Sequence, residues 1–421
     1  MLDIKYIREN KELVSKGAQD KHIKFDVEKL LELDAKLKPI KAEQETLQAE
    51  RNKISKDIPK SDGNDRPAMI EKVSSIKEKL ESLNDEVRDI QKQIKEFMLL
   101  VPQPAASDVP IGKDDSDNLE VKTFGNQTQF DFKPKSHIEL GQSLGLIDFE
   151  RGTKISGSRS YVLTGDGARL EQAVLRFTYD TLVDRGYTPM GVPVLVTEAC
   201  MEGTGYFPTG RDQAYYIEED QLALIGTGEV PLAAYHSGEM LSEDQLPIKL
   251  MAQSGCFRRE AGSYGKDTKG LYRVHQFNKI EQVIISKNCV EESKRLHEEL
   301  LGNAEFILQQ LELPYRVVYV CTGDLGQGQL RKHDIETWMP SRDAYGETHS
   351  CSTFHEFQAR RLSIKYKDGD KKKHFCHTLN NTAIASPRIL IPLLEVHQTA
   401  DGKINIPQAL RPYLNGLDQI G

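Results

Sequence analysis

The sequence predicts an α+β protein. An N-terminal arm, an antiparallel two-helix coiled coil, precedes a domain built on a mixed, mainly antiparallel sheet flanked by helices. Three observations support this prediction: two heptad-spaced segments near the N-terminus, a proline-rich stretch after them, and short alternating strands mixed with amphipathic helices in the rest of the 421 residues. A chain of this length has room for two or three domains.

Two segments of the N-terminal quarter carry apolar or long side chains at alternating spacings of three and four residues. The first runs from Leu30 to Ile54 and the second from Val73 to Phe97. Such spacing is typical of a coiled-coil seam. The breaker-rich stretch DIPKSDGNDRPA separates them, so residues 26–98 are expected to fold back as an antiparallel helix pair about 45 Å long. The heptads alone are equally consistent with a dimerisation rod.

The stretch VPQPAASDVPIGKDDSDN, residues 101–118, predicts a linker because prolines, a glycine and acidic residues cluster in it. The domain boundary is expected within residues 99–118, which assigns residues 1–110 to an N-terminal domain and residues 111–421 to a second domain. In the second domain, the patterns predict helices over 165–186 and 293–313 and strands over 315–321 and 362–367.

Composition narrows the class of protein. The formal net charge of −8 argues against a uniformly basic nucleic-acid binder, so any RNA contact would use local patches. The six cysteines include no CxxC pair, which suits reduced thiols rather than a disulfide framework. No run of eighteen apolar residues occurs, and the start MLDIKYIREN lacks the order of a signal peptide. We therefore expect a cytoplasmic protein that does not bind membranes.

The segment CFRREAGSYGKDTKGLYRVHQFNKIEQ, residues 256–282, predicts a hairpin with a charged and aromatic face. Alternation places on this face Ser254, Cys256, Arg258 and Glu260 from the first strand, and Arg273, His275, Phe277, Lys279 and Glu281 from the second. The connecting loop carries Gly262, Gly265, Lys266, Lys269 and Gly270. Such a face is costly to bury unless its charges pair or bind a ligand. The pattern therefore favours a site for an anion and an aromatic base over a solvated sheet face.

This segment resembles the second signature motif of seryl-tRNA synthetases, a family of class II aminoacyl-tRNA synthetases. Other segments resemble further motifs of that family in the expected order. The stretch DFERGTKISGSRSYVLTGDGARLEQAVLRF resembles the beginning of the catalytic domain, PVLVTEACMEGTGYFP the dimer-forming first motif around Pro193, and TGEVPL the serine-recognition loop. GETHSCSTFHEFQARR resembles a nucleotide-binding segment and NNTAIASPRILIPLLE the third motif. With the arm, the resemblance spans almost the whole chain.

The resemblance implies a serine–tRNA ligase. Such an enzyme activates L-serine with ATP to seryl-adenylate, releases pyrophosphate, and transfers serine to the 3′ end of serine tRNA with release of AMP. ATP, Mg²⁺ and a homodimer are implied as well, and DNA is not a partner. Two alternatives stay open: a serine-activating paralogue that charges another acceptor, such as a carrier protein, and a non-catalytic dimeric RNA-binding paralogue. The sequence also leaves open whether selenocysteine tRNA is a second acceptor.

The implied nucleotide site combines charged clamps with an aromatic ring. Arg258 would pair with the α-phosphate through its bidentate fork, where charge builds during attack by the serine carboxylate. Glu260 would accept from the adenine amino group, and Phe277 would stack on the adenine. The whole ATP set implied is Arg258, Arg259, Glu260, Val274, Phe277, Glu347, Thr348, His349, Ser350 and Arg388. Three of these are assigned to catalysis: Arg258, Glu347 and Arg388.

The third motif is expected to supply a second phosphate clamp. Ser386 would cap a helix that has Pro387 at its first position, which places Arg388 in the first turn beside the γ-phosphate. Glu347 and Ser350 would hold magnesium, which suits a hard ion that keeps most of its waters.

The serine and tRNA sites are also implied by the resemblance. The serine set is Thr227, Gly228, Glu229, Arg258, Glu281, Asn380 and Thr382. Glu281 is suited to the serine ammonium, and Thr382 lies near the hydroxyl. A polar group left unpaired by alanine costs about 1 to 3 kcal/mol, so the hydroxyl is the basis of selectivity. The distal arm segment ERNKISKDI would bind phosphates of the long variable arm of serine tRNA through Arg51, Lys53 and Lys56.

Several residues depart from the family pattern or invite other interpretations. Arg259 replaces a small residue, and its opposite parity also suits a salt bridge at the rim. Gly228 and His349 stand where alanine and a small hydroxyl residue are usual, and Pro392 would remove a helix donor at a cost of about 3 kcal/mol.

A zinc site is disfavoured because no finger-like spacing joins Cys351, His355, His374, Cys376 and His377. The run KDGDKKKH favours a solvated hairpin tip over an RNA patch.

Overall fold

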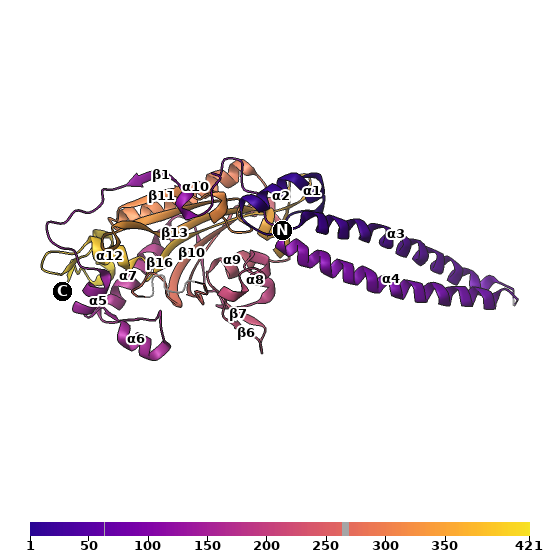
Figure 1. Ribbon diagram of the computed structural model, residues 1–421, viewed down its shortest axis with the longest axis horizontal. Coiled ribbons are helices and arrows are strands. Elements are labelled where there is room, and N and C mark those ends of the chain that lie inside the picture. The colour runs from indigo at the N-terminus through magenta and orange to yellow at the C-terminus, as the bar shows by residue number, and fades with distance from the viewer. Residues whose placement is uncertain (63, 263–268) are drawn as a thin grey trace. The chain divides into compact units, whose positions relative to one another are not determined.

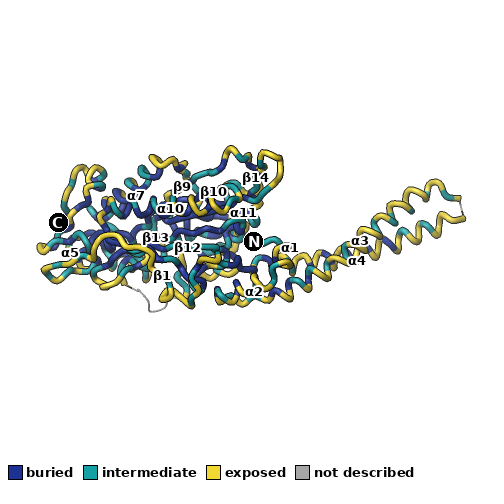
Figure 2. Tube along the Cα trace, turned by 90° about the horizontal axis from the view of Figure 1, so that it is seen from above, coloured by how far each residue is buried: buried dark blue, intermediate teal, exposed yellow. Residues whose placement is uncertain are grey.

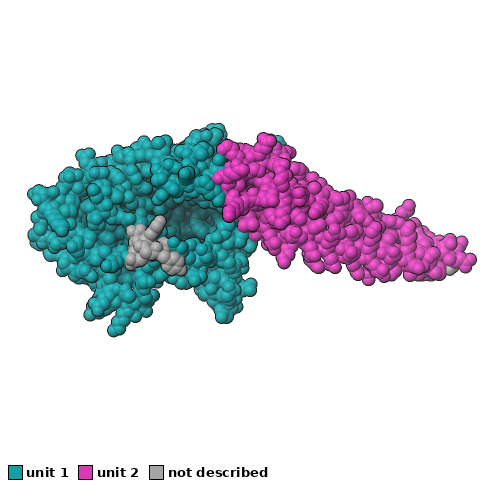
Figure 3. Space-filling model, in the orientation of Figure 1, with its two compact units in different colours: residues 1, 20–22, 103–421 teal, residues 2–19, 23–102 magenta. Residues whose placement is uncertain are grey.

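The computed structural model of the protein describes residues 1–62, 64–262 and 269–421. Within them the chain forms two compact units, drawn in two colours in Figure 3. The smaller unit comprises residues 2–19 and 23–102, and the larger unit comprises residues 1, 20–22 and 103–421. The division after residue 102 falls inside the range 99–118. Throughout the described residues, no helix has the length and apolar character needed to cross a bilayer.

The smaller unit is built around an antiparallel helix pair, as the heptads predict (Figure 1). Its helices are α1 (Ile4–Glu9), α2 (Lys11–Asp20), α3 (Val27–Asp57) and α4 (Arg66–Leu100), with a short 3₁₀ turn at Ile58–Lys60. Every predicted seam position is buried or half-buried. Because α3 supplies one half of the seam and α4 the other, the seam closes within one chain.

The larger unit contains an eight-stranded sheet in the order β1-β11-β12-β13-β16-β10-β9-β4. All its pairings are antiparallel except that of β4 with β9, so the predicted mixed, mainly antiparallel sheet is confirmed. The strands are β1 (Leu119–Phe124), β4 (Thr188–Met190), β9 (Ile248–Phe257), β10 (Gln276–Ser286), β11 (Tyr315–Tyr319), β12 (Arg331–Met339), β13 (Ala344–His355) and β16 (His377–Ser386).

Two long helices pack on one face of this sheet and define its core. They are α7 (Asp166–Asp184) and α10 (Val290–Gln310), which confirms the helices predicted over 165–186 and 293–313. Leu170 of α7, Leu300 of α10 and Leu379 of β16 belong to one buried cluster, and the central strands are buried in Figure 2. Since side chains alternate along a strand, the neighbours of Leu379 turn toward the opposite face.

Shorter elements complete the larger unit. The helices are α5 (His137–Ser143), α6 (Phe149–Ser156), α8 (Glu198–Thr204), α9 (Glu229–Ala234), α11 (Glu356–Leu362) and α12 (Leu390–Val396). The strands are β2 (Ile147–Asp148), β3 (Val162–Leu163), β5 (Leu195–Thr197), β6 (Tyr216–Ile217), β7 (Leu222–Leu224), β8 (Met240–Ser242), β14 (Lys365–Lys367), β15 (Lys373–Phe375), β17 (Ile404–Asn405) and β18 (Gln419–Ile420). The strand predicted over 362–367 starts only at Lys365, because α11 reaches Leu362 and Ser363 adopts a left-handed φ of 57°.

The predicted hairpin forms, with shorter strands than expected. Phe277 lies opposite Cys256, and Lys279 lies opposite Ser254, so the predicted common face is confirmed within the strands. The strands end at Phe257 and begin again at Gln276, which leaves Arg258, Glu260, Arg273 and His275 in the connection. Glu260 has a φ of 52°, which a strand does not accommodate. The loop residues Gly265 and Lys266 lie outside the described residues.

The helix of the third motif starts later than predicted. Ser386 is the last residue of β16, and its hydroxyl donates to Glu171 Oε1 at 2.8 Å instead of capping a helix. The helix α12 begins at Leu390, so the prediction of Pro387 at its first position is wrong, and Arg388 lies in the turn before it. Pro392 is the third helical residue. An N–H at that position has no partner within the helix, so the cost expected for Pro392 does not arise.

Candidate active site

Two pockets share one wall on the sheet face opposite α7 and α10, and a hollow is visible on the surface of the larger unit in Figure 3. The first pocket is lined by the hairpin connection, β10, β13 and the turn at Arg388. The second is a cavity of about 250 Å³ that reaches from β10 and β16 to α9 and the loop 326–329. Four residues line both pockets: Arg258, Lys279, Glu347 and Thr382.

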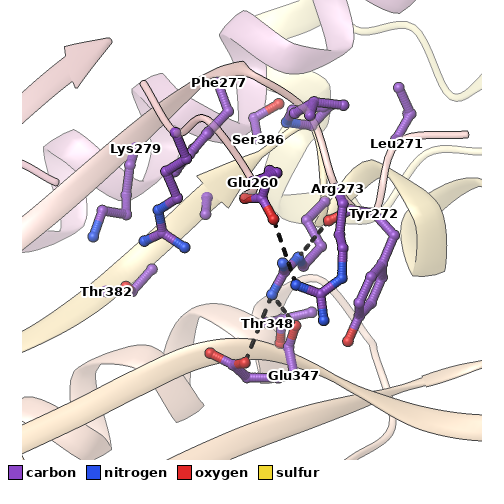
Figure 4. A pocket seen from close by; sticks show the side chains of 15 residues that line it. Glu260, Leu271, Tyr272, Arg273, Phe277, Lys279, Glu347, Thr348, Thr382 and Ser386 are labelled. Atoms are coloured by element: carbon purple, nitrogen blue, oxygen red, sulfur yellow. Dashed lines mark hydrogen bonds and ion pairs between the residues drawn. The ribbon is translucent and has the colours of Figure 1, made fainter. Parts of the chain in front are cut away.

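The first pocket brings the second motif against the third. Arg258 holds its guanidinium 5.2 Å from the centre of the Phe277 ring, and its Nε donates to the Gly226 carbonyl at 3.3 Å. Glu260 and Arg273 form an ion pair at 3.5 Å. In Figure 4, Lys279 and Thr382 lie at one end of this pocket and Tyr272 at the other. A planar cation beside an aromatic ring suits a ligand that combines phosphate with a base.

Arg388 is held in place by backbone contacts rather than by a helix end. Its Nη1 donates to the Glu347 carbonyl at 2.9 Å, and its Nε donates to the Tyr272 carbonyl at 3.1 Å. The guanidinium lies 4.4 Å from the centre of the Tyr272 ring and 3.9 Å from the Glu347 carboxylate. This arrangement places a positioned cation at the first pocket.

Glu347 stands among cations at the wall between the pockets. Desolvation by itself raises the pKa of Glu347, but Lys332, Arg388 and Arg258 outweigh it and hold the pKa below its ordinary value. Ser350, three residues further along β13, lines the second pocket. Across residues 1–62, 64–262 and 269–421, no three His, Cys, Asp or Glu side chains group as a metal site. A carboxylate and a hydroxyl fit an ion such as Mg²⁺ that keeps several waters and shares phosphate oxygens.

The second pocket contains a buried network of polar groups. The Thr227 hydroxyl donates to Glu281 Oε2 at 3.0 Å and accepts from the Lys279 ammonium at 2.6 Å. Lys279 and Glu281 also form an ion pair. All three side chains are buried, so their mutual contacts supply the partners that buried polar groups need.

Glu229 forms a second buried polar group in this pocket. Its carboxylate accepts from the Tyr206 hydroxyl at 2.7 Å and from Gln358 Nε2 at 2.6 Å. Burial, assisted by the charge of Glu281, raises the pKa of Glu229 to about 7. The wall beside it therefore carries a carboxyl that changes charge near neutral pH.

Most residues expected from the sequence lie at these pockets, with exceptions. The first pocket is lined by Arg258, Glu260, Val274, Phe277, Glu347, Thr348 and Arg388. The second is lined by Thr227, Glu229, Arg258, Glu281, Ser350, Asn380 and Thr382. Arg259, Gly228 and His349 line neither. His349 is buried in the core, where its ring nitrogens meet the Thr348 hydroxyl at 2.9 Å and the Ala383 carbonyl at 3.1 Å.

A bulge in β13 explains why His349 lies away from the pocket. The pairing of β12 with β13 shifts between Ile335–His349 and Glu336–Glu347, so Thr348 is an extra residue. Glu347 and Thr348 consequently both line the first pocket, and His349 turns toward the core. Simple alternation does not reveal such a bulge.

Sequence reasoning missed several lining residues. Lys279 was placed on the correct strand face but not assigned to the site. No local pattern indicates Tyr206, which lines the second pocket, or Gln358, which does not line it, although both donate hydrogen bonds to Glu229. A tyrosine and a glutamine at these positions carry no local signal. Tyr206 lies 23 positions from Glu229 in the chain and Gln358 lies 129 positions from it, so only the fold brings them together.

The antiparallel sheet, the arginine of the hairpin connection and the arginine before α12 define a class II aminoacyl-tRNA synthetase. The profile "tRNA synthetase class II core domain (G, H, P, S and T)" matches residues 215–397, and "Seryl-tRNA synthetase N-terminal domain" matches residues 1–104. The chain is 46% identical to the serine–tRNA ligase of Deinococcus radiodurans and 43% identical to that of Treponema denticola. Both alignments span 100% of this chain, and they cover 99% and 100% of those relatives. The chain belongs to the seryl-tRNA synthetase family.

Solved structures agree with this assignment. Seryl-tRNA synthetase from Pyrococcus horikoshii, complexed with ATP, superposes on this chain with a TM-score of 0.92 at 38% identity. The match covers 100% of this chain and 99% of the Pyrococcus horikoshii chain. The cytoplasmic serine–tRNA ligase from Naegleria fowleri, in complex with AMP, gives a TM-score of 0.87 at 31% identity. That match covers 100% of this chain and 98% of the Naegleria fowleri chain.

The raised pKa of Glu229 predicts a pH-dependent stability. Between its usual pKa of 4.5 and its folded value of about 7, the folded protein keeps a proton that the unfolded chain has lost. The free energy of unfolding therefore falls as pH rises through this window, by at most about 3 kcal/mol. Glu229→Gln is neutral at every pH and lacks this dependence. We expect the Tm of the wild type minus that of the variant to fall between pH 4.5 and 7.

The matched control is Glu219→Gln, which removes a carboxylate at an exposed position. Its Tm should run parallel to the wild-type curve. A parallel curve for Glu229→Gln as well would contradict the pKa of Glu229 given by its burial.

Proposed function

We propose that this protein activates L-serine with ATP to seryl-adenylate and transfers the seryl group to the 3′ end of serine tRNA. The observation that carries the proposal is the shared wall of the two pockets. The first pocket has a ring and two arginines suited to a nucleotide, and the second has a small buried polar network suited to an amino acid. A reaction between the two ligands needs a junction of this kind.

The side chains support an in-line attack of the serine carboxylate on the α-phosphorus. Arg258 lines both pockets and would stabilise the charge that builds on the α-phosphate. Phe277 would stack on the base and Glu260 would accept from its amino group, while Arg388 would hold the departing pyrophosphate. Mg²⁺, held by Glu347 and Ser350, would neutralise phosphate charge when bound.

Selectivity for serine would come from the buried polar groups of the second pocket. Thr227, Glu229 and Glu281 are buried, as are Asn380 and Thr382 of β16. A ligand without a hydroxyl leaves a buried donor or acceptor without a partner, whereas serine satisfies it. The pocket thereby rejects alanine during binding.

The decisive test is serine-dependent exchange of pyrophosphate into ATP, followed by charging of total tRNA. We expect exchange with serine and a rate at least about 10²-fold lower with alanine at equal concentration, because polar recognition discriminates strongly against a missing hydroxyl. Equal rates with the two amino acids would refute the assignment of the second pocket. Exchange without charging would favour another acceptor.

Replacement of Arg258 tests the first pocket. Arg258→Ala removes the cation from the shared wall while leaving the core untouched, since Arg258 is exposed. We expect the exchange rate to fall about 10²- to 10³-fold, as for other donors directed at transition-state charge. Arg176→Ala is the control, because Arg176 is an exposed arginine of α7 that lines neither pocket. Near-normal exchange in a folded Arg258→Ala protein would contradict the assigned role.

The coiled-coil arm would bind the long variable arm of serine tRNA through Arg51, Lys53 and Lys56. These residues lie at the distal end of α3, where Lys53 and Lys56 are exposed. We expect their joint replacement by glutamine to leave exchange unchanged and to weaken tRNA binding. The slope of log affinity against log salt should fall in magnitude by about two to three, because each phosphate contact contributes about 0.7 to 0.9.

Exposed lysines at the other end of the arm provide the control. Lys92→Gln with Lys95→Gln changes charge on α4 far along the chain from the distal segment. This pair of changes should leave charging intact. Equal losses in both variants would point to a general effect of charge.

A cytoplasmic homodimer completes the proposal. The stretch MGVPVLVTEAC runs from the last residue of the edge strand β4 through β5, and Leu195 of β5 is 41% exposed. An apolar segment at a sheet edge is a liability unless another chain covers it. We expect a dimer by sedimentation at micromolar protein, and a monomer with full charging activity would contradict it.

A further inference from the structure

The shared wall contains a second cation that no role above uses. Arg258 and Lys279 both line the two pockets, but Arg258 is exposed, whereas Lys279 is only 5% exposed. Burying an ammonium is costly unless it is paired and hydrogen-bonded. A buried lysine at the junction of two ligand pockets therefore needs partners in every state of the protein.

Lys279 takes its partners from the second pocket. Its ammonium donates to Thr227 Oγ1 at 2.6 Å and pairs with Glu281. These are two of the groups expected to receive the ammonium of serine. The Lys279 ammonium thus lies against the same carboxylate that a substrate ammonium would use. Two ammonium groups beside one carboxylate repel each other, so binding of the substrate requires Lys279 to exchange partners.

The carboxylate of the amino acid can replace Glu281 as the partner of the Lys279 ammonium. An amino acid carries a carboxylate two bonds from its ammonium, and the reaction requires this carboxylate to reach the α-phosphate at the junction. Lys279 lines the first pocket as well as the second, next to Thr382 in Figure 4. A flexible four-carbon side chain at this place has only a short way to turn from Glu281 to the incoming carboxylate.

We propose that Lys279 binds the carboxylate of the amino acid and guides it to the α-phosphate, while Glu281 is released to the substrate ammonium. This inference rests on the proposed function. Lys279 stays an ammonium throughout. One carboxylate oxygen forms the new bond to phosphorus, the bond from phosphorus to the bridging oxygen breaks, and its electron pair leaves with pyrophosphate. The cation reduces the repulsion between two anionic reactants.

The competing explanation is a purely structural ion pair, in which Lys279 only orients Glu281 and Thr227. The two explanations differ in one measurable respect. A role toward the carboxylate requires a ligand that has one. Serinamide keeps the ammonium and the hydroxyl of serine but replaces its carboxylate by an amide, so its binding does not use the proposed contact.

The test compares binding of serine and serinamide to the full-length protein by calorimetry. We expect Lys279→Met to weaken serine binding about 30-fold, as loss of one charge-assisted hydrogen bond does, and not to weaken serinamide binding, because serinamide offers Lys279 no carboxylate to bind. Lys249→Met is the matched control. Lys249 lies on β9, forms an ion pair with Glu299 of α10 at 2.6 Å, and lines neither pocket. Both ligands should bind this control as they bind the wild type.

A second variant separates folding from binding. Lys279→Arg keeps the cation, and its affinity for serine should lie between those of the wild type and Lys279→Met, with a cooperative thermal transition to show that the variant is folded. Equal losses of serine and serinamide affinity in Lys279→Met, or no loss of either, would overturn the inference in favour of the structural pair. A wild-type protein that binds serine but supports no exchange would instead refute the proposed function.

Discussion

One face of the sheet in the larger unit packs in the apolar core, and the other face carries the polar residues of the two pockets. The site depends on this division between the faces. One face is sealed by α7 and α10, where Leu300 and Leu379 belong to a single buried cluster. Because neighbouring side chains of a strand point to opposite faces, burying one set places the next set on the far side. In β16 this puts Asn380 and Thr382 at the second pocket, next to Leu379 and Ala383 in the core. The packing that stabilises the sheet thus also aligns the polar residues.

The charges on the polar face pair with one another. Glu281 pairs with Lys279, Glu260 pairs with Arg273, and Arg388 binds the backbone beside Glu347. Breaking a buried pair by removing one member typically costs about 3 to 5 kcal/mol. A ligand that enters must therefore replace each partner that it displaces. An amino acid and a nucleotide, which carry both signs of charge between them, meet this condition.

Backbone irregularities bring the reactive groups to the pocket wall. The strands of the hairpin stop at Phe257 and Gln276, and Arg258 and Glu260 leave the plane of the sheet there. The bulge at Thr348 lets two successive residues of β13 face one pocket. The turn before α12 holds Arg388 by carbonyl contacts rather than by a helix end. Sites of catalysis commonly use such breaks, since regular strands offer only alternate positions.

The sequence by itself determined the class of fold, the arm and many of the residues that line the two pockets. Heptads in α3 and α4, and alternation at Phe277, Lys279 and Glu281, follow from local periodicity, which burial of one face imposes on any chain. The tertiary structure alone decided that Lys279 is buried between two pockets, that Tyr206 and Gln358 hold Glu229, and that His349 faces the core. These contacts join residues far apart in the chain or depend on a bulge, and local periodicity carries no information about either.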